Sequence, residues 1–229
     1  MPRTRARFCL PLLALALLAC AAAPAGAGAK ARPKERSLDA NFTVRIATAP
    51  GREDYLPVTN SMTMWVPAGV RAAGERMAKC AETTIEQRGA AYCPKASKVG
   101  TGVAKGYIYE TVEPMSVTLY NGTGRGSVLL AHIVGTAPVS IDAVVTGKIT
   151  KPKGGRYGYG QQLYFPFPPS LIYPVPGSTA SMIYMSAHLT GKSGWLRSRT
   201  CPPTGWSLGA ELGAADGGIT HIDADLRCV

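Results

Sequence analysis

The chain alternates apolar and polar residues with a period of two over most of its length, and this pattern limits the fold more than any other feature. Successive side chains of a β-strand point to opposite faces, so each alternating run predicts a half-buried strand. The clearest runs are residues 115–120, 139–149, 182–189 and 206–212. Further strands are expected near residues 42–47, 61–66, 127–134 and 161–165. About nine or ten short strands around one core predict an all-β fold, an antiparallel β-sandwich.

One segment departs from the two-residue period. Apolar residues between Pro67 and Gly89 recur at helical spacing, at Val70, Ala73, Met77, Ala81, Thr84 and Ile85. This spacing predicts a short helix, and Gly89 is a suitable C-terminal stop.

Strand register can be proposed for the last hairpin. Pairing Leu208 with Ile222 places the apolar side chains of both strands on one face and puts the turn at residues 213–218. The same register sets Cys228 opposite Pro202, next to Cys201, which suits a disulfide at the open end of the hairpin.

The first 29 residues have the composition of a signal peptide. Three arginines precede an apolar run from Cys9 to Ala23, and small residues follow up to Ala29. Cleavage after Ala27 or Ala29 fits an ordinary export signal and predicts a secreted or extracellular protein. Leu17-Leu18-Ala19-Cys20 also resembles a bacterial lipobox, so the alternative is a protein lipid-anchored through Cys20 to the outer face of the cell membrane.

Charge and composition predict the remaining organisation. Residues 30–40 are expected to form a basic flexible linker, and residues 41–229 a single β-sandwich domain. The signal and residues 30–36 carry six of the eleven net positive charges, which leaves about +5 on the rest of the chain, spread without a run. A nucleic-acid partner would require a concentrated basic face, so none is expected. Attraction to anionic lipid headgroups or wall polymers fits the basic surface better.

Four cysteines remain after the signal, namely Cys80, Cys93, Cys201 and Cys228. An even number in an exported chain predicts two disulfides, for which three connectivities are possible. We expect local pairing, Cys80 with Cys93 and Cys201 with Cys228. Metal binding would require paired Cys-x-x-Cys or Cys/His spacings, which do not occur, so no metal site and no cofactor are predicted.

A possible catalytic set arises in the hairpin around residues 135–138. Pairing Ile133 with Val139 would place His132 opposite Ser140, with Asp142 two residues farther on. A serine hydrolase also requires a strained nucleophile turn beside oxyanion donors, and a serine inside a strand lacks both. We therefore predict no catalytic residues, and we keep an extracellular serine hydrolase as the alternative function.

Other short patterns are weaker. His221, Asp223 and Asp225 alternate on one expected strand, but they would span about 13 Å, too far to converge on one cation. The segments 100–102 and 122–126 are rich in glycine without the spacing of a phosphate-binding loop, so turns are expected there.

Tyrosine and proline are concentrated between residues 157 and 176. Tyrosine offers a flat apolar face with a polar tip, which suits sugar rings or peptides, and proline keeps a segment extended. Tyr157, Tyr159, Tyr164 and Tyr173 are the candidate ligand-binding residues. The alternative is that these rings cap the core.

The segment from Cys93 to Gly102 resembles a Cys-Pro-x-x-Ser-x-Val-Gly-x-Gly block of exported, mostly actinobacterial proteins that have no assigned activity. A terminal Cys…Trp…Asp-Gly…Cys pattern, at Cys201, Trp206, Asp216-Gly217 and Cys228, is similar as well. The resemblance implies an all-β secreted protein and supports a disulfide role for the four cysteines. It implies no catalytic residue.

These observations predict a non-catalytic protein of the cell envelope or extracellular space, with a binding or structural role. Its partner is expected to be an extracellular polymer or protein, and membrane contact is expected only through a lipid anchor at Cys20. The sequence names neither the ligand nor the oligomeric state.

Overall fold

Antiparallel strands account for most of the computed structural model, which describes residues 34–45, 56–152, 158–214 and 219–229. Of Ser207 and residues 219–225 it describes the backbone alone. The strands of the described residues are β1 (Arg36–Arg45), β2 (Thr59–Pro67), β3 (Val70–Ala72), β4 (Lys98–Ile108), β5 (Thr111–Gly122), β6 (Val128–Gly135), β7 (Ile141–Thr150), β8 (Tyr159–Pro166), β9 (Ser181–Leu189), β10 (Leu196–Ser198), β11 (Trp206–Ala214) and β12 (Ile219–Cys228). The α-helices are α1 (Glu82–Arg88) and α2 (Pro169–Ile172), and the single-turn 3-10 helices are Gly74–Arg76, Ala90–Tyr92, Lys95–Ser97 and Gly191–Ser193.

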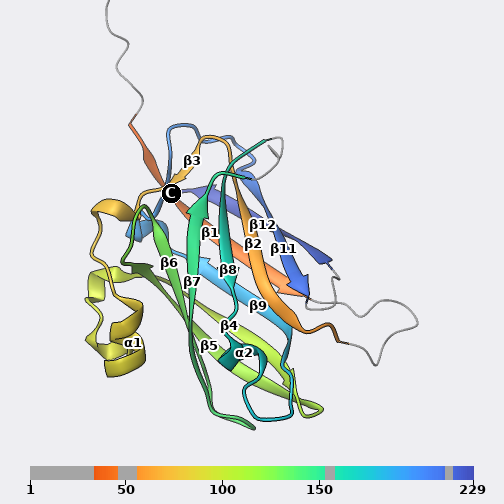
Figure 1. The fold of residues 1–229 in the computed structure, drawn as a ribbon. Helices are drawn as coiled ribbons and strands as arrows, with labels where there is room; N and C mark the ends of the chain where they lie inside the picture. Colours follow the sequence, from red (N-terminus) through yellow and green to blue (C-terminus); the bar gives the residue numbers. More distant parts are fainter. Residues whose placement is uncertain (1–33, 46–55, 153–157, 215–218) are drawn as a thin grey trace, which may run out of the picture. The chain divides into compact units, whose positions relative to one another are not determined.

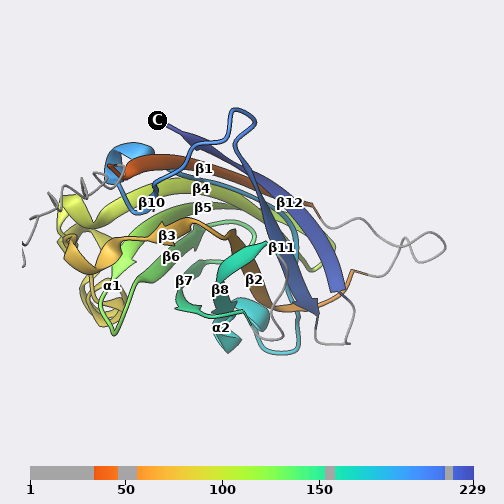
Figure 2. The same ribbon diagram turned by 90° about the horizontal axis from the view of Figure 1, so that it is seen from above.

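The sheet closes on itself. Its order is β12-β11-β2-β8-β7-β6-β5-β4-β9-β1, and β1 pairs with β12 as well as with β9. Strands β10 and β3 extend the sheet beyond one end of β1. Figure 1 shows the long strands side by side, and Figure 2 shows β1, β4 and β5 curving over the wall that contains β2, β7 and β8. The two walls pack across one core, which confirms the predicted all-β antiparallel class.

Alternation along each strand fills this core. In β5, Met115, Val117 and Leu119 are buried, whereas Ser116 is exposed, as the two-residue period predicts. Inward side chains of the other long strands join them in one cluster. A smaller cluster on the outer side contains Ile85 of α1 with Tyr120 and Val144 of the sheet.

The segment 100–102 is a strand rather than the expected turn. It lies within β4, paired with β5 and β9. A side chain at Gly100 would clash with the carbonyl oxygen of His188, and one at Gly102 with that of Ser186. Glycine is therefore required by the close approach of β9, not by a turn.

The predicted helix between Pro67 and Gly89 is wrong in its first half. Residues 70–72 form β3, and α1 begins only at Glu82. Tertiary hydrogen bonds hold the intervening segment, since the Asn121 side chain donates to the carbonyl oxygens of Gly74 and Ala78. The predicted stop is right, because Gly89 ends α1 with a φ of 90°, which favours glycine.

Both proposed hairpin registers are wrong, although the faces are right. Leu208 pairs with Ala224 rather than Ile222, a shift of two residues. In the β6–β7 hairpin, Ile133 pairs with Ala143 rather than Val139, a shift of four residues. Even shifts keep every side chain on its expected face, so the alternation alone does not distinguish the two registers.

Two disulfides have the expected local pairing. Cys80–Cys93 joins Cα atoms 5.2 Å apart and secures the segment that carries α1. Cys201–Cys228 joins Cα atoms 6.1 Å apart and ties the segment before β11 to the end of β12.

The domain begins earlier than expected. Residues 36–40 of the predicted linker belong to β1, where Leu38 and Ala40 are buried in the core. The compact unit spans Pro33–Val229, and the predicted signal segment lies outside the described residues. In the described part of the chain, no helix has the length and apolar character required to cross a membrane.

Candidate functional site

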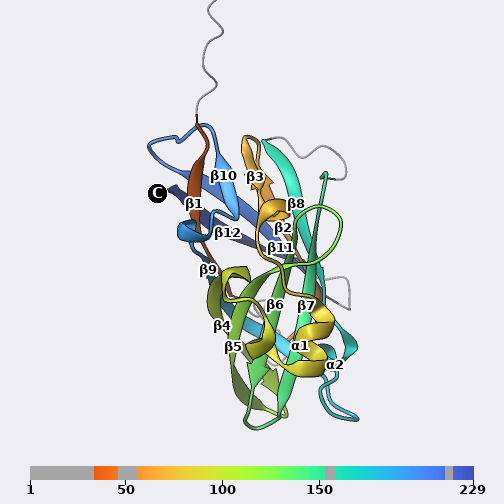
Figure 3. The same ribbon diagram turned by 90° about the vertical axis from the view of Figure 1, so that its left-hand side faces the viewer.

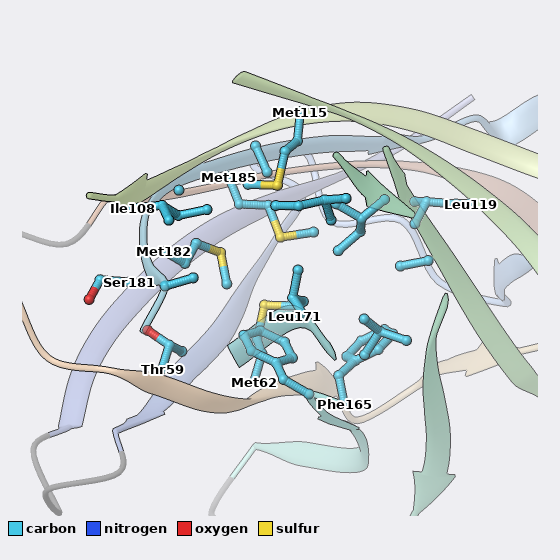
Figure 4. A pocket seen from close by; sticks show the side chains of 18 of the residues that line it. Thr59, Met62, Ile108, Met115, Leu119, Phe165, Leu171, Ser181, Met182 and Met185 are labelled. Carbon is cyan, nitrogen blue, oxygen red and sulfur yellow. The ribbon is translucent and has the colours of Figure 1, made fainter. Parts of the chain in front are cut away.

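An apolar cavity lies between the two walls of the sheet (Figure 4). Of the twenty described residues that line it, only Thr59 and Ser181 have polar side chains. The space between the wall atoms is partly open to solvent at a mouth. Only about 40 Å³ admits the centre of a water-sized sphere, so the walls lie close together. A cavity of this kind favours an apolar guest over water.

Small residues at inward positions create the space. Ala104 and Gly106 of β4 and Ala131 of β6 line the cavity at positions where the strand alternation places a core side chain. Larger side chains such as Leu129 and Phe165 form the rest of the wall. Interiors are normally packed to crystal-like density, so small residues on β4 and β6, the two neighbours of β5, leave room that no nearby side chain fills.

Four of the seven methionines of the chain line the same cavity, namely Met62, Met115, Met182 and Met185. Figure 4 shows their side chains reaching into the space from both walls. Methionine is unbranched and polarisable, so it adapts its shape to different neighbours. The wall is therefore suited to apolar guests of more than one shape.

The mouth lies beside the connection between β8 and β9, residues 167–180, which we call the α2 segment. Phe167, Leu171 and Ala180 of this segment line the cavity and are only half-buried, whereas most of the other wall residues are buried. The Phe167 amide donates to the carbonyl oxygen of Asn60 at 2.8 Å. Every hydrogen bond that residues 168–180 make in the described structure stays within the segment. Apolar packing alone therefore holds most of this segment over the cavity.

The two polar side chains of the wall lie close to the mouth. Thr59 begins β2 and Ser181 begins β9, and both are buried. Figure 4 shows the two hydroxyl groups on one side of the cavity. The Ser181 hydroxyl donates to the carbonyl oxygen of Leu56 at 3.1 Å. The deeper wall is left without a polar side chain.

Glu113 is the one fully buried carboxylate among the described residues. Its two oxygens accept hydrogen bonds from the amides of Ala137, at 3.0 Å, and Val139, at 3.1 Å. These bonds hold the β6–β7 loop and satisfy the charge, which leaves no free oxygen directed at the cavity. The carboxylate is thus a structural group.

The predicted Ser140, His132 and Asp142 do not come together as a triad. His132 Nε2 lies 2.8 Å from Asp142 Oδ1 on the outer face of β6 and β7. Ser140 lies in the loop before β7 and makes no hydrogen bond to His132. His132 pairs with Val144, four residues and about 13 Å along the strand from Ser140. The pair also faces away from the cavity.

The candidate tyrosines do not form one surface. Tyr157 lies outside the described residues, and the Tyr159 ring is half-buried with its centroid 6.4 Å from that of Trp65. Tyr164 is exposed on the outer face of β8, and Tyr173 is exposed just after α2. Of these residues, Tyr173 alone belongs to the α2 segment at the mouth.

The side chains of His221, Asp223 and Asp225 also lie outside the described part of the structure, and the backbone pairs these residues with Glu211, Gly209 and Ser207. Among the described residues, no three His, Cys, Asp or Glu side chains are grouped as a metal site would require.

Sequence reasoning missed the cavity. The sequence does contain one indication of it, namely small residues where the strand alternation expects large core side chains. These residues are Ala104, Gly106 and Ala131. These residues become a site only once the strands facing them are known. Comparisons of the chain with protein-family models, curated proteins and solved structures give no match. The cavity is therefore the basis for the proposal that follows.

Proposed function

We propose that this protein is a non-catalytic binding protein that takes up the hydrocarbon part of a small apolar or amphiphilic molecule between the walls of its closed sheet. The observation that carries the proposal is the cavity wall, in which Thr59 and Ser181 are the only polar side chains. Ligand pockets are typically mostly apolar with a few placed polar groups, as here.

The hydrophobic effect supplies the binding energy. Each buried methylene contributes about 0.8 kcal/mol, so eight methylenes contribute about 6 kcal/mol before the entropic costs of association. A buried polar group of the ligand would find hydrogen-bond partners only at Thr59 and Ser181, near the mouth. The ligand class is therefore one with an apolar chain or ring system and a polar end that remains at the mouth.

Uptake requires the wall to move. The space reachable by a water-sized sphere is about 40 Å³, smaller than a hydrocarbon chain needs. Because the hydrogen bonds of residues 168–180 to other described residues stay within the segment, the α2 segment can shift without breaking a strand pair. The methionine side chains then adjust to the guest.

The place of action is outside the cytosol. Support comes from the signal-like first 29 residues and from the two disulfides, which persist in oxidising compartments. We propose that the protein is secreted or held by a lipid anchor at Cys20.

Filling the cavity tests the proposal. Ala131→Leu and Ala104→Leu add side-chain volume to the cavity wall on either side of β5, and Ser116→Leu adds the same group on the exposed outer face as a matched control. Binding of N-phenyl-1-naphthylamine, whose fluorescence rises in apolar surroundings, should weaken at least about tenfold in the two cavity variants and stay unchanged in the control. Native mass spectrometry of protein purified from its host should show a co-purified apolar molecule that the cavity variants lose.

The thermal midpoint separates a binding cavity from ordinary core packing. Inserting methylenes into a well-packed core costs about 1–3 kcal/mol, whereas filling an existing space costs little. Weakened probe binding at an unchanged or raised thermal midpoint would support the proposal. Probe affinity equal to that of the unaltered protein in both cavity variants would contradict it.

A further inference from the structure

Exposed apolar side chains occur in two segments at the end of the domain where the α2 segment lines the cavity. Tyr109 and Val112 belong to the β4–β5 hairpin and Tyr173 follows α2, and their exposed fractions are 58%, 45% and 55%. Figures 1 and 3 show this hairpin and the α2 segment at the same lower end of the molecule. We call these three residues the apolar rim. An exposed apolar group beside a ligand mouth is typical of an interaction surface.

The turn of the β4–β5 hairpin carries one charged side chain, the exposed Glu110. The α2 segment, residues 167–180, contains no Asp, Glu, Lys or Arg. The loop between β6 and β7, residues 136–140, contains none either. An anionic lipid surface repels carboxylates, and these two loops add none to that of Glu110.

Two exposed cations lie on the outer face of the sheet, on β1 and β4. The Arg45 guanidinium carbon lies 5.8 Å from the centre of the Tyr184 ring, and Lys105 Nζ lies 5.9 Å from it. Both residues pair with Tyr184 across neighbouring strands, one step from Gly106 in the cavity wall. In the described structure, neither cation forms an ion pair with an acidic side chain. The remaining net charge of about +5, outside the predicted signal and residues 30–36, has the same sign.

We propose that the mouth end docks onto an anionic lipid surface, with the apolar rim in the headgroup layer and Arg45 and Lys105 against the lipid phosphates. Tyrosine is enriched at membrane interfaces because its ring is apolar and its hydroxyl is polar. Basic residues near an anionic leaflet add attraction that acts over about a Debye length. Docking in this orientation brings the cavity mouth to the place where apolar ligands reside. The inference rests on the proposed function only for that last step.

A surface of this kind could also bind a protein partner. The observations favour lipid instead. The rim is made of separate side chains on two loops rather than a continuous face, and a cation pair stands beside it. This combination of inserted aromatic groups and adjacent basic groups is that of membrane-surface binding.

Vesicle flotation tests the docking. The exported protein carries Cys20→Ser, so that an acyl chain cannot cause binding. It is mixed with vesicles of phosphatidylglycerol and phosphatidylcholine, or of phosphatidylcholine alone. We expect binding to the anionic vesicles that weakens strongly in 1 M salt, where the Debye length falls to about 3 Å.

Paired variants separate the two parts of the surface. Arg45→Gln with Lys105→Gln should lower the partition coefficient on anionic vesicles by about tenfold or more, since each cation near the surface contributes about fivefold. Tyr109→Ser with Tyr173→Ser should lower the partition coefficient by about tenfold, both at low salt and in 1 M salt. The matched controls are Lys98→Gln and Tyr92→Ser, which alter an exposed lysine at the opposite end of β4 and an exposed tyrosine beside Cys93. Both controls should bind as the unaltered protein does.

The outcomes also distinguish docking from ligand binding. Probe binding without vesicles should be unchanged in all four variants, because none of these residues lines the cavity. Equal vesicle binding by the rim, cation and control variants would overturn the docking inference. So would the absence of vesicle binding by the unaltered protein, even if the probe still binds. Loss of probe binding in the cavity variants alone bears on the proposed function and leaves docking to be judged by flotation.

Discussion

Asn121 shows how much one buried polar side chain organises in this protein. It is fully buried near the end of β5, and its amide nitrogen donates to the carbonyl oxygens of Gly74 and Ala78, at 2.9 Å each. Its carbonyl oxygen accepts a hydrogen bond from Trp195 Nε1 at 3.0 Å. The side chain therefore joins the segment before α1 to the sheet. This role cannot be predicted from the sequence, because its three partners lie more than forty residues away.

Removing that amide should be costly. Asn121→Ala leaves the buried Trp195 Nε1 donor without its partner and removes one hydrogen bond from each of the Gly74 and Ala78 carbonyl oxygens, and we expect a loss of about 3 kcal/mol in the free energy of unfolding. Urea denaturation followed by tryptophan fluorescence measures it. Asn41→Ala, at an exposed position of β1, is the matched control and should change stability little. Equal stability of the two variants would show that the network is not important.

Glu35 makes a small part of the stability dependent on pH. Hydrogen bonding from Arg71, at 3.0 Å to Oε1, is the largest cause that lowers the pKa of this carboxyl below its ordinary value of 4.5. Because the folded-state pKa lies below the unfolded one, the stabilisation is present above about pH 4.5 and is lost as the pH falls through the lowered value. Glu35→Gln should remove that acid-dependent part. Urea midpoints from pH 3 to pH 7 check it, with the exposed Glu86→Gln as control; parallel profiles for the two variants would contradict the assignment.

At the scale of the element, alternation predicted most of the long strands and the faces they bury. It failed where a local pattern and a tertiary contact disagree. Val70 and Ala73 have helical spacing with Met77, but pairing with β10 makes residues 70–72 a strand. The glycines of β4 weaken a strand pattern in the sequence, and only the neighbouring β9 backbone explains them. The predicted registers of two hairpins were wrong by two and four residues. The alternation does not detect an even shift, because every side chain stays on the same face.

The α2 segment should open locally more often than the strands around it. Its hydrogen bonds from residues 168–180 are internal, and half-buried apolar contacts hold it to the sheet. In hydrogen exchange, we expect the amides of Leu171 and Ala180 to exchange at least about tenfold faster than those of buried Leu130 in β6. Saturating N-phenyl-1-naphthylamine should slow exchange in the α2 segment and leave β6 unchanged. Exchange of the segment at the β6 rate, with or without the probe, would contradict an opening mouth.

At the scale of the whole molecule, closure of the sheet is the feature that could not be predicted from the sequence. β1 pairs with β12 near the other end of the chain, as in Phe42 with Ala224. No local pattern encodes a contact of that separation, so an antiparallel fold was predictable while the closed ring and its cavity were not. The burial of the residues in the cavity wall was predictable, because they occupy the apolar positions of their strands.

The two disulfides should act on different parts of this architecture. Cys201–Cys228 closes a loop of 27 residues, and Cys80–Cys93 closes one of 13. The chain-entropy model gives about 3.5 and about 3 kcal/mol, respectively. We therefore expect both double serine variants to lose stability in urea by similar amounts. Cys80 and Cys93 belong to the outer cluster with α1, which does not line the cavity. Their variant should bind the apolar probe with unchanged affinity wherever it remains folded. An affinity reduced tenfold at full folding would show that the outer cluster shapes the cavity.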